Sequence, residues 1–151
     1  PLYFPPGIRG DAPVNAARYW GISNPEYYKR ADVWPLAPQG EVMCVIMCEE
    51  LRAIKNLPKI LEEVPGIGAV LIGEGDLSQE MGIPRQYDHP DLRAAMADII
   101  AICKAHNVTV GHPHVDADNV ERVLSEGYTW LMPSGVTTHP ALVKGRQLAG
   151  R

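Results

Sequence analysis

Two stretches decide the fold: VMCVIMCEE (residues 42–50) and AVLIGEGDLS (residues 69–78). Each begins as a short apolar run that leads into acidic residues, with Glu49 in the first stretch and Asp76 in the second. The two carboxylates are 27 positions apart, about the length of one strand–helix–strand unit. Because parallel strands end at the same edge of a sheet, we expect Glu49 and Asp76 on neighbouring strands at the carboxyl edge, where α/β enzymes place their chemistry.

Two carboxylates at such an edge are hard oxygen ligands that can share Mg²⁺ or Mn²⁺. The competing interpretation is that Glu49 caps a helix starting at Glu50 and Asp76 caps a turn starting at Leu77, although Glu is a poor N-cap. Residues 73–78 form a glycine turn whose free N–H groups would bind an anion such as a carboxylate or phosphate. A plain turn made tight by glycine is the alternative, and the turn lacks the ending of a phosphate-binding P-loop.

The chain from residue 42 to residue 151 alternates strand and helix four times, whereas residues 1–41 form an irregular, aromatic lead-in with short helical pieces around 15–20 and 26–31. Alternation of this kind predicts a parallel sheet with right-handed crossovers. Four units in ~110 residues fit a small open sheet or half of a (β/α)₈ barrel. The run 42–48 is continuously apolar, as in a strand buried on both faces. The expected strands cover 42–48, 69–72, 108–111 and 129–132. The expected helices cover 50–63, 76–81, 90–105 and 138–149, with a further helix that is capped by Asp116 or Asp118 and runs through Glu126.

Bulk properties indicate one globular domain over 151 residues. A net charge of −4 argues against a nucleic-acid surface and a polybasic membrane surface, and no apolar run approaches the ~20 residues of a membrane span. The three cysteines, Cys44, Cys48 and Cys103, lie in apolar contexts and are typical of reduced, buried thiols. Without a visible signal peptide, we expect a cytoplasmic protein.

Two further motifs are candidates for the site. In Gly111-His112-Pro113-His114 the paired histidines suggest zinc, but a third and fourth ligand are not evident, so we expect His112 to line a substrate pocket or to support a ligand. In Gly7-Ile8-Arg9-Gly10, Arg9 either reaches an anionic group or lies in a surface turn. Cys48 has no evident histidine partner and is not expected to act as a nucleophile.

Four strings together resemble the HpcH/HpaI aldolase family of class II, metal-dependent pyruvate aldolases: PPGIRG (5–10), MCEELRAIKNLPKI (47–60), VPGIGAVLIGEGDLSQEMG (64–82) and DHPDLRAAM (88–96). The resemblance implies a (β/α)₈ barrel that binds Mg²⁺, Mn²⁺ or Co²⁺. It implies that Glu49 and Asp76 are the metal ligands, and that the N–H groups of Gly75 and Asp76 hold the pyruvate carboxylate.

The chain departs from the family pattern at three positions. Met47 stands where the family has a glutamine that contacts substrate, so it is the expected substrate neighbour without that hydrogen bond. Glu74 replaces a proline and would bring an extra carboxylate near the metal, and Glu50 replaces a threonine. The match also starts about halfway through the family pattern, so residues 1–151 are predicted to be the C-terminal half of a single barrel domain. We assign no catalytic residue to this chain, because the family's base and transition-state arginine belong to the N-terminal half.

By this resemblance the activity is carbon–carbon cleavage or condensation of 4-hydroxy-2-oxo acids, giving pyruvate and an aldehyde. Half a barrel leaves two open sheet edges, so we expect the N-terminal half in cis or as a second fragment. Relatives suggest a homo-oligomer, a hexamer built from dimers. The alternatives are a lyase of the citrate-lyase β or malyl-CoA type, a non-catalytic half-barrel paralogue, and a small flavodoxin-like domain, whose phosphate loop Glu49 and Glu50 would disfavour.

Overall fold

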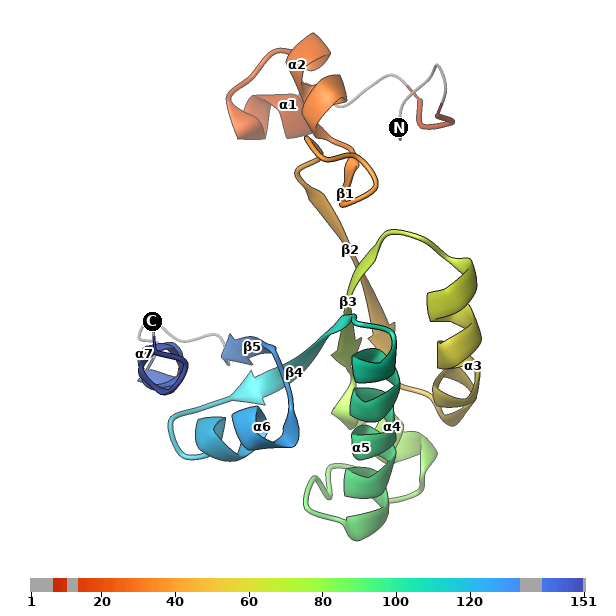
Figure 1. The fold of residues 1–151 in the computed structure, drawn as a ribbon, viewed down its shortest axis with the longest axis vertical. Coiled ribbons are helices and arrows are strands. Elements are labelled where there is room, and N and C mark those ends of the chain that lie inside the picture. Colours follow the sequence, from red (N-terminus) through yellow and green to blue (C-terminus); the bar gives the residue numbers. More distant parts are fainter. Residues whose placement is uncertain (1–6, 11–13, 134–139, 151) are drawn as a thin grey trace. The chain divides into compact units, whose positions relative to one another are not determined.

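The computed structural model describes residues 7–10, 14–133 and 140–150 (Figure 1). The chain divides into two compact units, residues 1–44 with 65–68 and residues 45–64 with 69–151. Each unit is described by itself. The elements are α1 (Val14–Trp20), α2 (Asn24–Arg30), β1 (Val33–Trp34), β2 (Val42–Cys48), α3 (Leu51–Glu63), β3 (Ile67–Ile72), α4 (Glu74–Glu80), α5 (Pro90–Ala105), β4 (Thr109–Val115), α6 (Val120–Glu126), β5 (Trp130–Pro133) and α7 (Pro140–Leu148).

The first unit is organised around the short helices α1 and α2. Ala17, Tyr27 and Ala31 form its small buried core. Ser23 caps α2 by accepting the N–H of Glu26 at 3.3 Å, as expected of a serine before a helix. The two helical pieces predicted within residues 1–41 are therefore present. The lead-in is less irregular than predicted, because Val33 and Trp34 form β1, which pairs in parallel with the first residues of β2. A strand of two residues is too short to show a pattern of alternating polarity in the sequence.

The five strands are parallel and follow the order β1-β2-β3-β4-β5. In the second unit Ala69 pairs with Thr109 and Gly111 pairs with Trp130. A register shift follows in β4, after which Val115 pairs with Pro133. Each strand from β2 onward is followed by helix, so sequential strands are neighbours in the sheet, as in half of a (β/α)₈ barrel.

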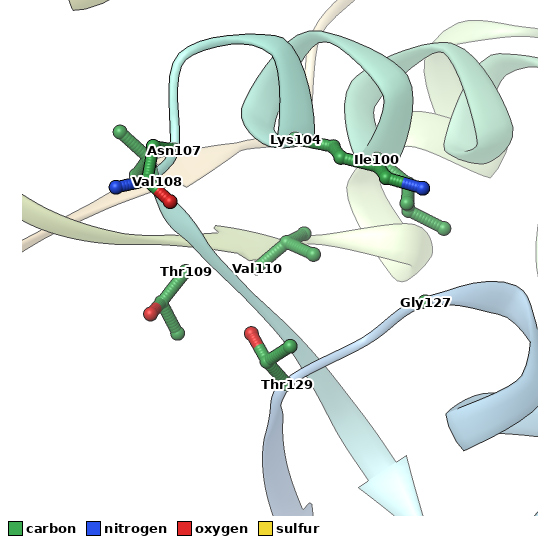
Figure 2. Close-up of a pocket in the computed structure, with 8 residues that line it drawn as sticks. All are labelled: Ile100, Lys104, Asn107, Val108, Thr109, Val110, Gly127 and Thr129. Atoms are coloured by element: carbon green, nitrogen blue, oxygen red, sulfur yellow. The ribbon is translucent and has the colours of Figure 1, made fainter.

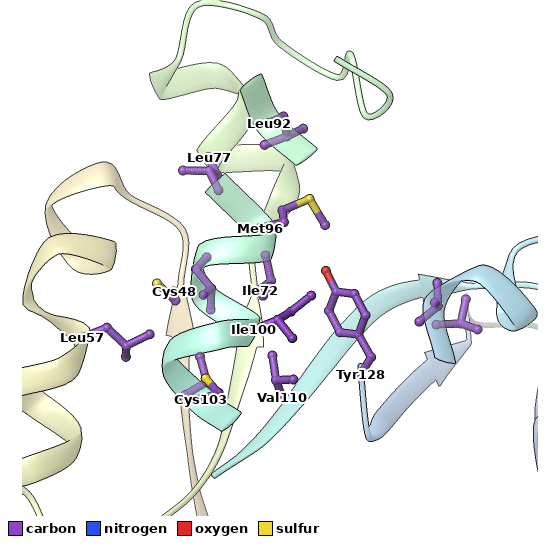
Figure 3. Close-up of a cluster of buried hydrophobic side chains, with 14 of the residues drawn as sticks. Cys48, Leu57, Ile72, Leu77, Leu92, Met96, Ile100, Cys103, Val110 and Tyr128 are labelled. Carbon is purple, nitrogen blue, oxygen red and sulfur yellow. The ribbon is translucent and has the colours of Figure 1, made fainter. Parts of the chain in front are cut away.

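The core of the second unit lies between the strands and the helices that cover them. Figure 3 shows α5 side chains such as Met96 and Ile100 meeting Ile72 of β3, Val110 of β4 and Tyr128. Apolar residues spaced three and four apart on α5 supply the stripe that faces the sheet. This packing fixes the strands whose ends carry the candidate site.

One prediction about β2 is wrong. The apolar run predicts a strand buried on both faces, but its burial alternates, and Met43, Val45 and Met47 are 47%, 37% and 55% exposed. Successive side chains of a strand point to opposite faces, so these three share one face. No described residue covers that face fully, whereas Cys48 at the strand end is buried.

Among the described residues, no helix combines the length and the apolar character needed to cross a membrane.

Candidate functional site

Glu49 and Gly73 are neighbours at the carboxyl ends of β2 and β3. The N–H of Gly73 donates to the carbonyl oxygen of Cys48 at 3.0 Å, which joins the two strand ends. A Cβ atom built on Gly73 would lie 2.6 Å from both Cβ and Oε2 of Glu49, closer than real Cβ contacts come. Glycine is therefore required here, because the Glu49 side chain occupies the space a larger residue would fill.

The capping interpretation of the two carboxylates is not what the structure shows. The N-cap of α3 is Glu50 and the N-cap of α4 is Gly73, and neither makes a side-chain capping bond. The first N–H of α3, on Leu51, instead donates to Oε2 of Glu80 at 2.6 Å. Glu49 and Asp76 are thus left free of helix capping.

Glu49 and Asp76 line one open cleft of about 570 Å³. Among the described residues, neither carboxylate accepts a hydrogen bond or forms an ion pair. Carboxylate oxygens that line an open cleft are available as ligands for a hard divalent cation. Besides this pair, the cleft is lined by Glu50, Gln79 and Glu80.

Two of these lining residues are not anticipated from the sequence. Gln79 and Glu80 follow Asp76 at spacings of three and four, which places all three on one face of α4. Once residues 74–80 are known to form a helix, this spacing predicts the shared face. The sequence pattern indicates only a short helical turn over residues 76–81, which hides the shared face.

Glu74 lies elsewhere than expected. The sequence suggests an extra carboxylate near the metal ligands, but the Glu74 side chain is only 5% exposed and its Oε1 atom lies 2.6 Å from Nδ1 of His114. It lines a second pocket, of about 290 Å³, with His112, His114 and other polar side chains. A carboxylate this deeply buried requires such a partner, and that requirement turns it away from the cleft.

The remaining predicted residues fall in different places. Met47 is exposed on β2. Gly75 lies in the first turn of α4 with open space next to its Cα atom, because a Cβ atom built there would lie 4.0 Å from its nearest neighbour, Oη of Tyr87. His112 is buried and lines the Glu74 pocket, not the Glu49–Asp76 cleft. Arg9 is exposed and belongs to the first unit. The sequence also suggests the loop 133–138 as a wall of the pocket, and all of this loop except Pro133 lies outside the described residues.

A third pocket has no carboxylate or imidazole among its described lining residues. Figure 2 shows a pocket of about 330 Å³ between the end of α5 and the start of β4. Lys104 is its only charged lining residue among those described, and the others are apolar or neutral: Ile100, Asn107, Val108, Thr109, Val110, Gly127 and Thr129.

The donor set of the cleft fits a cation that takes only part of its ligands from protein. No group of three or more His, Cys, Asp or Glu side chains within the described part of the chain is gathered to hold a metal alone. Two carboxylates in an open, water-accessible cleft suit Mg²⁺ or Mn²⁺, which usually keep several water ligands.

Sequential parallel βα units of this kind form half of a (β/α)₈ barrel, a fold whose enzymes place their sites at the carboxyl edge of the strands. A model of the HpcH/HpaI aldolase/citrate lyase family matches residues 3–141, and the chain belongs to that family.

Known relatives agree with this membership. The chain is 31% identical over 153 residues to a 2-dehydro-3,6-dideoxy-6-sulfogluconate aldolase of Pseudomonas putida, covering 96% of this chain and 56% of that protein. It is 32% identical over 149 residues to a 4-hydroxy-2-oxovalerate aldolase of Rhodococcus jostii, covering 99% and 54%. A crystal structure of an HpcH/HpaI aldolase/citrate lyase family protein from Burkholderia cenocepacia superposes with a TM-score of 0.70 at 24% identity, covering 96% and 52%. The chain therefore spans about half the length of the relatives it matches.

Proposed function

We propose that the protein containing this chain is a divalent-metal-dependent aldolase that cleaves 4-hydroxy-2-oxo acids to pyruvate and an aldehyde. The observation that carries the proposal is the open cleft that Glu49, after β2, and Asp76, in the first turn of α4, both line without a hydrogen-bond or ion-pair partner among the described residues. The family membership and the relatives named as aldolases support it.

In this proposal Glu49 and Asp76 hold the metal, Mg²⁺, Mn²⁺ or Co²⁺, through carboxylate oxygens. When bound, a divalent cation supplies Lewis acidity toward the keto oxygen and carboxylate of a 2-oxo acid. The N–H groups of Gly75 and Asp76, in the first turn of α4, are unpaired within the helix and point out of its N-terminus, so they suit the substrate carboxylate. Met47, on the exposed face of β2, contributes apolar surface and no hydrogen bond.

The base that takes the proton from the 4-hydroxyl group is not assigned to this chain. We infer that it comes with the rest of the barrel, either from further residues of the same polypeptide or from a second fragment. Two observations support this: the chain spans about half the length of its relatives, and the Met43–Val45–Met47 face of β2 is exposed. Intact-mass analysis of the natural protein with N-terminal sequencing tests it. A chain of roughly 25–30 kDa, the mass of a ~250-residue barrel, or a co-purifying fragment is expected.

The activity test measures pyruvate release from a panel of 4-hydroxy-2-oxo acids in the intact protein, with and without added Mn²⁺. Chelation should abolish turnover, and readdition of metal should restore it. Glu49→Gln and Asp76→Asn should each lower kcat/KM by at least about 100-fold, since loss of a metal worth several kcal/mol is a factor of this size. Glu50→Gln removes a charge from the same cleft without touching a proposed ligand and is the matched control.

The proposal fails if turnover survives chelation, or if Glu49→Gln is no worse than Glu50→Gln. The family description also includes citrate lyase, so acyl-CoA thioesters belong in the substrate panel. Cleavage of a thioester without cleavage of any free 4-hydroxy-2-oxo acid would favour the citrate-lyase type. Absence of both activities, and of any Mn²⁺ binding, would favour a non-catalytic paralogue.

A further inference from the structure

Glu74 is a buried acid at the first position of α4, and two imidazoles from β4 face its carboxylate. Oε1 lies 2.6 Å from Nδ1 of His114, and Oε2 lies 3.7 Å from Nε2 of His112. Glu74 and His112 are 4% and 3% exposed, whereas the His114 side chain is 56% exposed. A carboxylate removed from water to this degree is stable only with partners of this kind.

The hydrogen bonds fix how the two imidazoles face Glu74. Nδ1 of His112 accepts the N–H of His114 at 3.2 Å, so the neutral ring carries its proton on Nε2, toward Glu74. Burial lowers the pKa of His112, and the Glu74 carboxylate offsets this only in part, which keeps the ring neutral. Its edge also packs against Tyr128, with ring centroids 4.9 Å apart. His114 donates through Nδ1, because a carboxylate only accepts.

The backbone that Glu74 anchors is the first turn of α4. Leu77 donates its N–H to the carbonyl of Gly73 at 3.0 Å, and Ser78 Oγ donates to the carbonyl of Gly75 at 2.7 Å. The N-cap, Gly73, contributes no side-chain bond. The Glu74 side chain is therefore the described link between the start of α4 and the end of β4.

We propose that Glu74, His112 and His114, here called the α4 clamp, are positioning residues. They fix the first turn of α4 and so set the direction of the Asp76 carboxylate and the Gly75 N–H. This inference rests on the proposed function, because it assigns the clamp to the same site. The family pattern has a proline at the position of Glu74, and the fixed backbone angle of proline suits the first residue of a helix. The α4 clamp achieves the same end through a side chain.

The clamp differs from an ordinary surface pair, and the chain offers such a pair for comparison. His106 lies 3.6 Å from Glu62 on the outer helices, but the Glu62 side chain is 67% exposed. Water screens a pair of that kind, so it positions little. Glu74 has no such screening, and loss of its short bond leaves a buried acceptor without its donor.

The experiment compares His114→Ala, His114→Asn and His106→Ala in the intact protein. Asparagine can place a donor near the position of Nδ1, so it is the conservative rescue, and His106→Ala removes an imidazole from the screened pair. Two readouts are taken: hydrogen exchange of the Leu77 amide, without ligand, and affinity for Mn²⁺ and for oxalate in its presence. Oxalate is the probe because it presents the same adjacent oxygens as a 2-oxo acid.

We expect His114→Ala to speed exchange at Leu77 and to weaken Mn²⁺ or oxalate binding by about 10- to 100-fold, the usual cost of losing a residue that supports a metal ligand. His114→Asn should recover most of both, and His106→Ala should change neither. Unchanged exchange in His114→Ala refutes the clamp even in an active aldolase. Faster exchange with affinity within about twofold of the parent shows that the clamp stabilises α4 without positioning the site, and overturns the proposal. If the parent protein binds neither probe, the proposed function fails, and with it the clamp's role at that site; the exchange data then report only on α4.

Discussion

Substitution of Gly73 by alanine tests whether Glu49 is a metal ligand without altering any ligand. Gly73 has φ −90° and ψ 73°, so alanine meets no left-handed backbone strain. The added methyl group would lie 2.6 Å from Cβ and Oε2 of Glu49. The effect of the substitution is therefore steric and is aimed at one side chain.

The size of the displacement follows from the contact distances. Ordinary contact begins at 3.4 Å, so the pair is 0.8 Å too close (3.4 − 2.6). The oxygen can rotate away, but the Cβ of Glu49 is fixed to the backbone, so the end of β2 must move by about that amount. Misplacement of a site group by about 1 Å costs roughly 100-fold in rate, or about 2.7 kcal/mol.

The assay measures Mn²⁺ affinity, kcat/KM and the free energy of unfolding for Gly73→Ala and for a control, Gly68→Ala. Gly68 lies near the other end of the same strand, and a Cβ there would meet Cγ of Met43 at the same 2.6 Å. Both variants should lose up to about 1–3 kcal/mol of stability through overpacking. Gly73→Ala alone should weaken Mn²⁺ binding and lower kcat/KM, each by one to two orders of magnitude.

A Gly73→Ala variant that binds Mn²⁺ as tightly as Gly68→Ala would refute the assignment of Glu49. Equal losses in both variants would show that general destabilisation, and not displacement of Glu49, weakens the site.

Three further predictions concern buried groups. The Tyr128 hydroxyl is buried with no hydrogen-bond partner among the described residues, so Tyr128→Phe should stabilise the protein by about 1 kcal/mol in urea unfolding, and a loss of stability would reveal a hidden partner. Burial lowers the pKa of His112 below its ordinary value of 6.5, so the unfolded chain takes up a proton that the folded chain does not. The free energy of unfolding should therefore fall as pH drops below about 6.5, and His112→Gln should flatten that dependence; a dependence that survives the substitution would exclude His112 as its source. Burial raises the pKa of Cys48 and Cys103 to about 11, so a disulfide reagent at pH 8 should label the half-buried Cys44 first. If Cys48 or Cys103 of the folded protein reacted before Cys44, that result would contradict their burial.

Much of the fold could be predicted because local signals were strong. Pro90 at the first helical position and Asn107 with φ 54° just after the last turn mark the limits of α5, as the sequence indicated. The end of β4 was harder. The expected strand ended at residue 111, but β4 continues through Pro113 to Val115 across a register shift, which accommodates a residue without an N–H donor.

The start of α6 shows how a correct signal can be placed wrongly. Asp116 was a predicted cap, and its Oδ1 does accept two N–H groups, from Asp118 at 2.9 Å and Asn119 at 2.8 Å. Those bonds close an Asx-type turn before the helix, and the N-cap is Asn119. Only the three-dimensional course of the loop separates these two uses of one side chain.

Part of the candidate site could likewise be predicted from the sequence, and part could not. The placement of Glu49 and Asp76 in one cleft followed from the rule that parallel strands share an edge. The partners of Glu74 did not follow from sequence, because His112 and His114 come 38 and 40 positions later and meet Glu74 only through the pairing of β3 with β4. Contacts fixed by tertiary packing carry no local signal.

The bond from Leu51 to Glu80 has a consequence for ligand binding. Glu80 belongs to α4 and accepts the first N–H of α3. The N–H of Gly73, before α4, donates to the carbonyl oxygen of Cys48 at the end of β2. Two hydrogen bonds therefore connect two successive βα segments beside the cleft. Glu49 and Asp76 both belong to the second compact unit but to different βα segments within it, and each bond limits how far those two segments can separate. A site assembled in advance loses less conformational entropy when its ligand arrives. If the proposed function holds, these two bonds would lower the entropic cost of binding a ligand between Glu49 and Asp76.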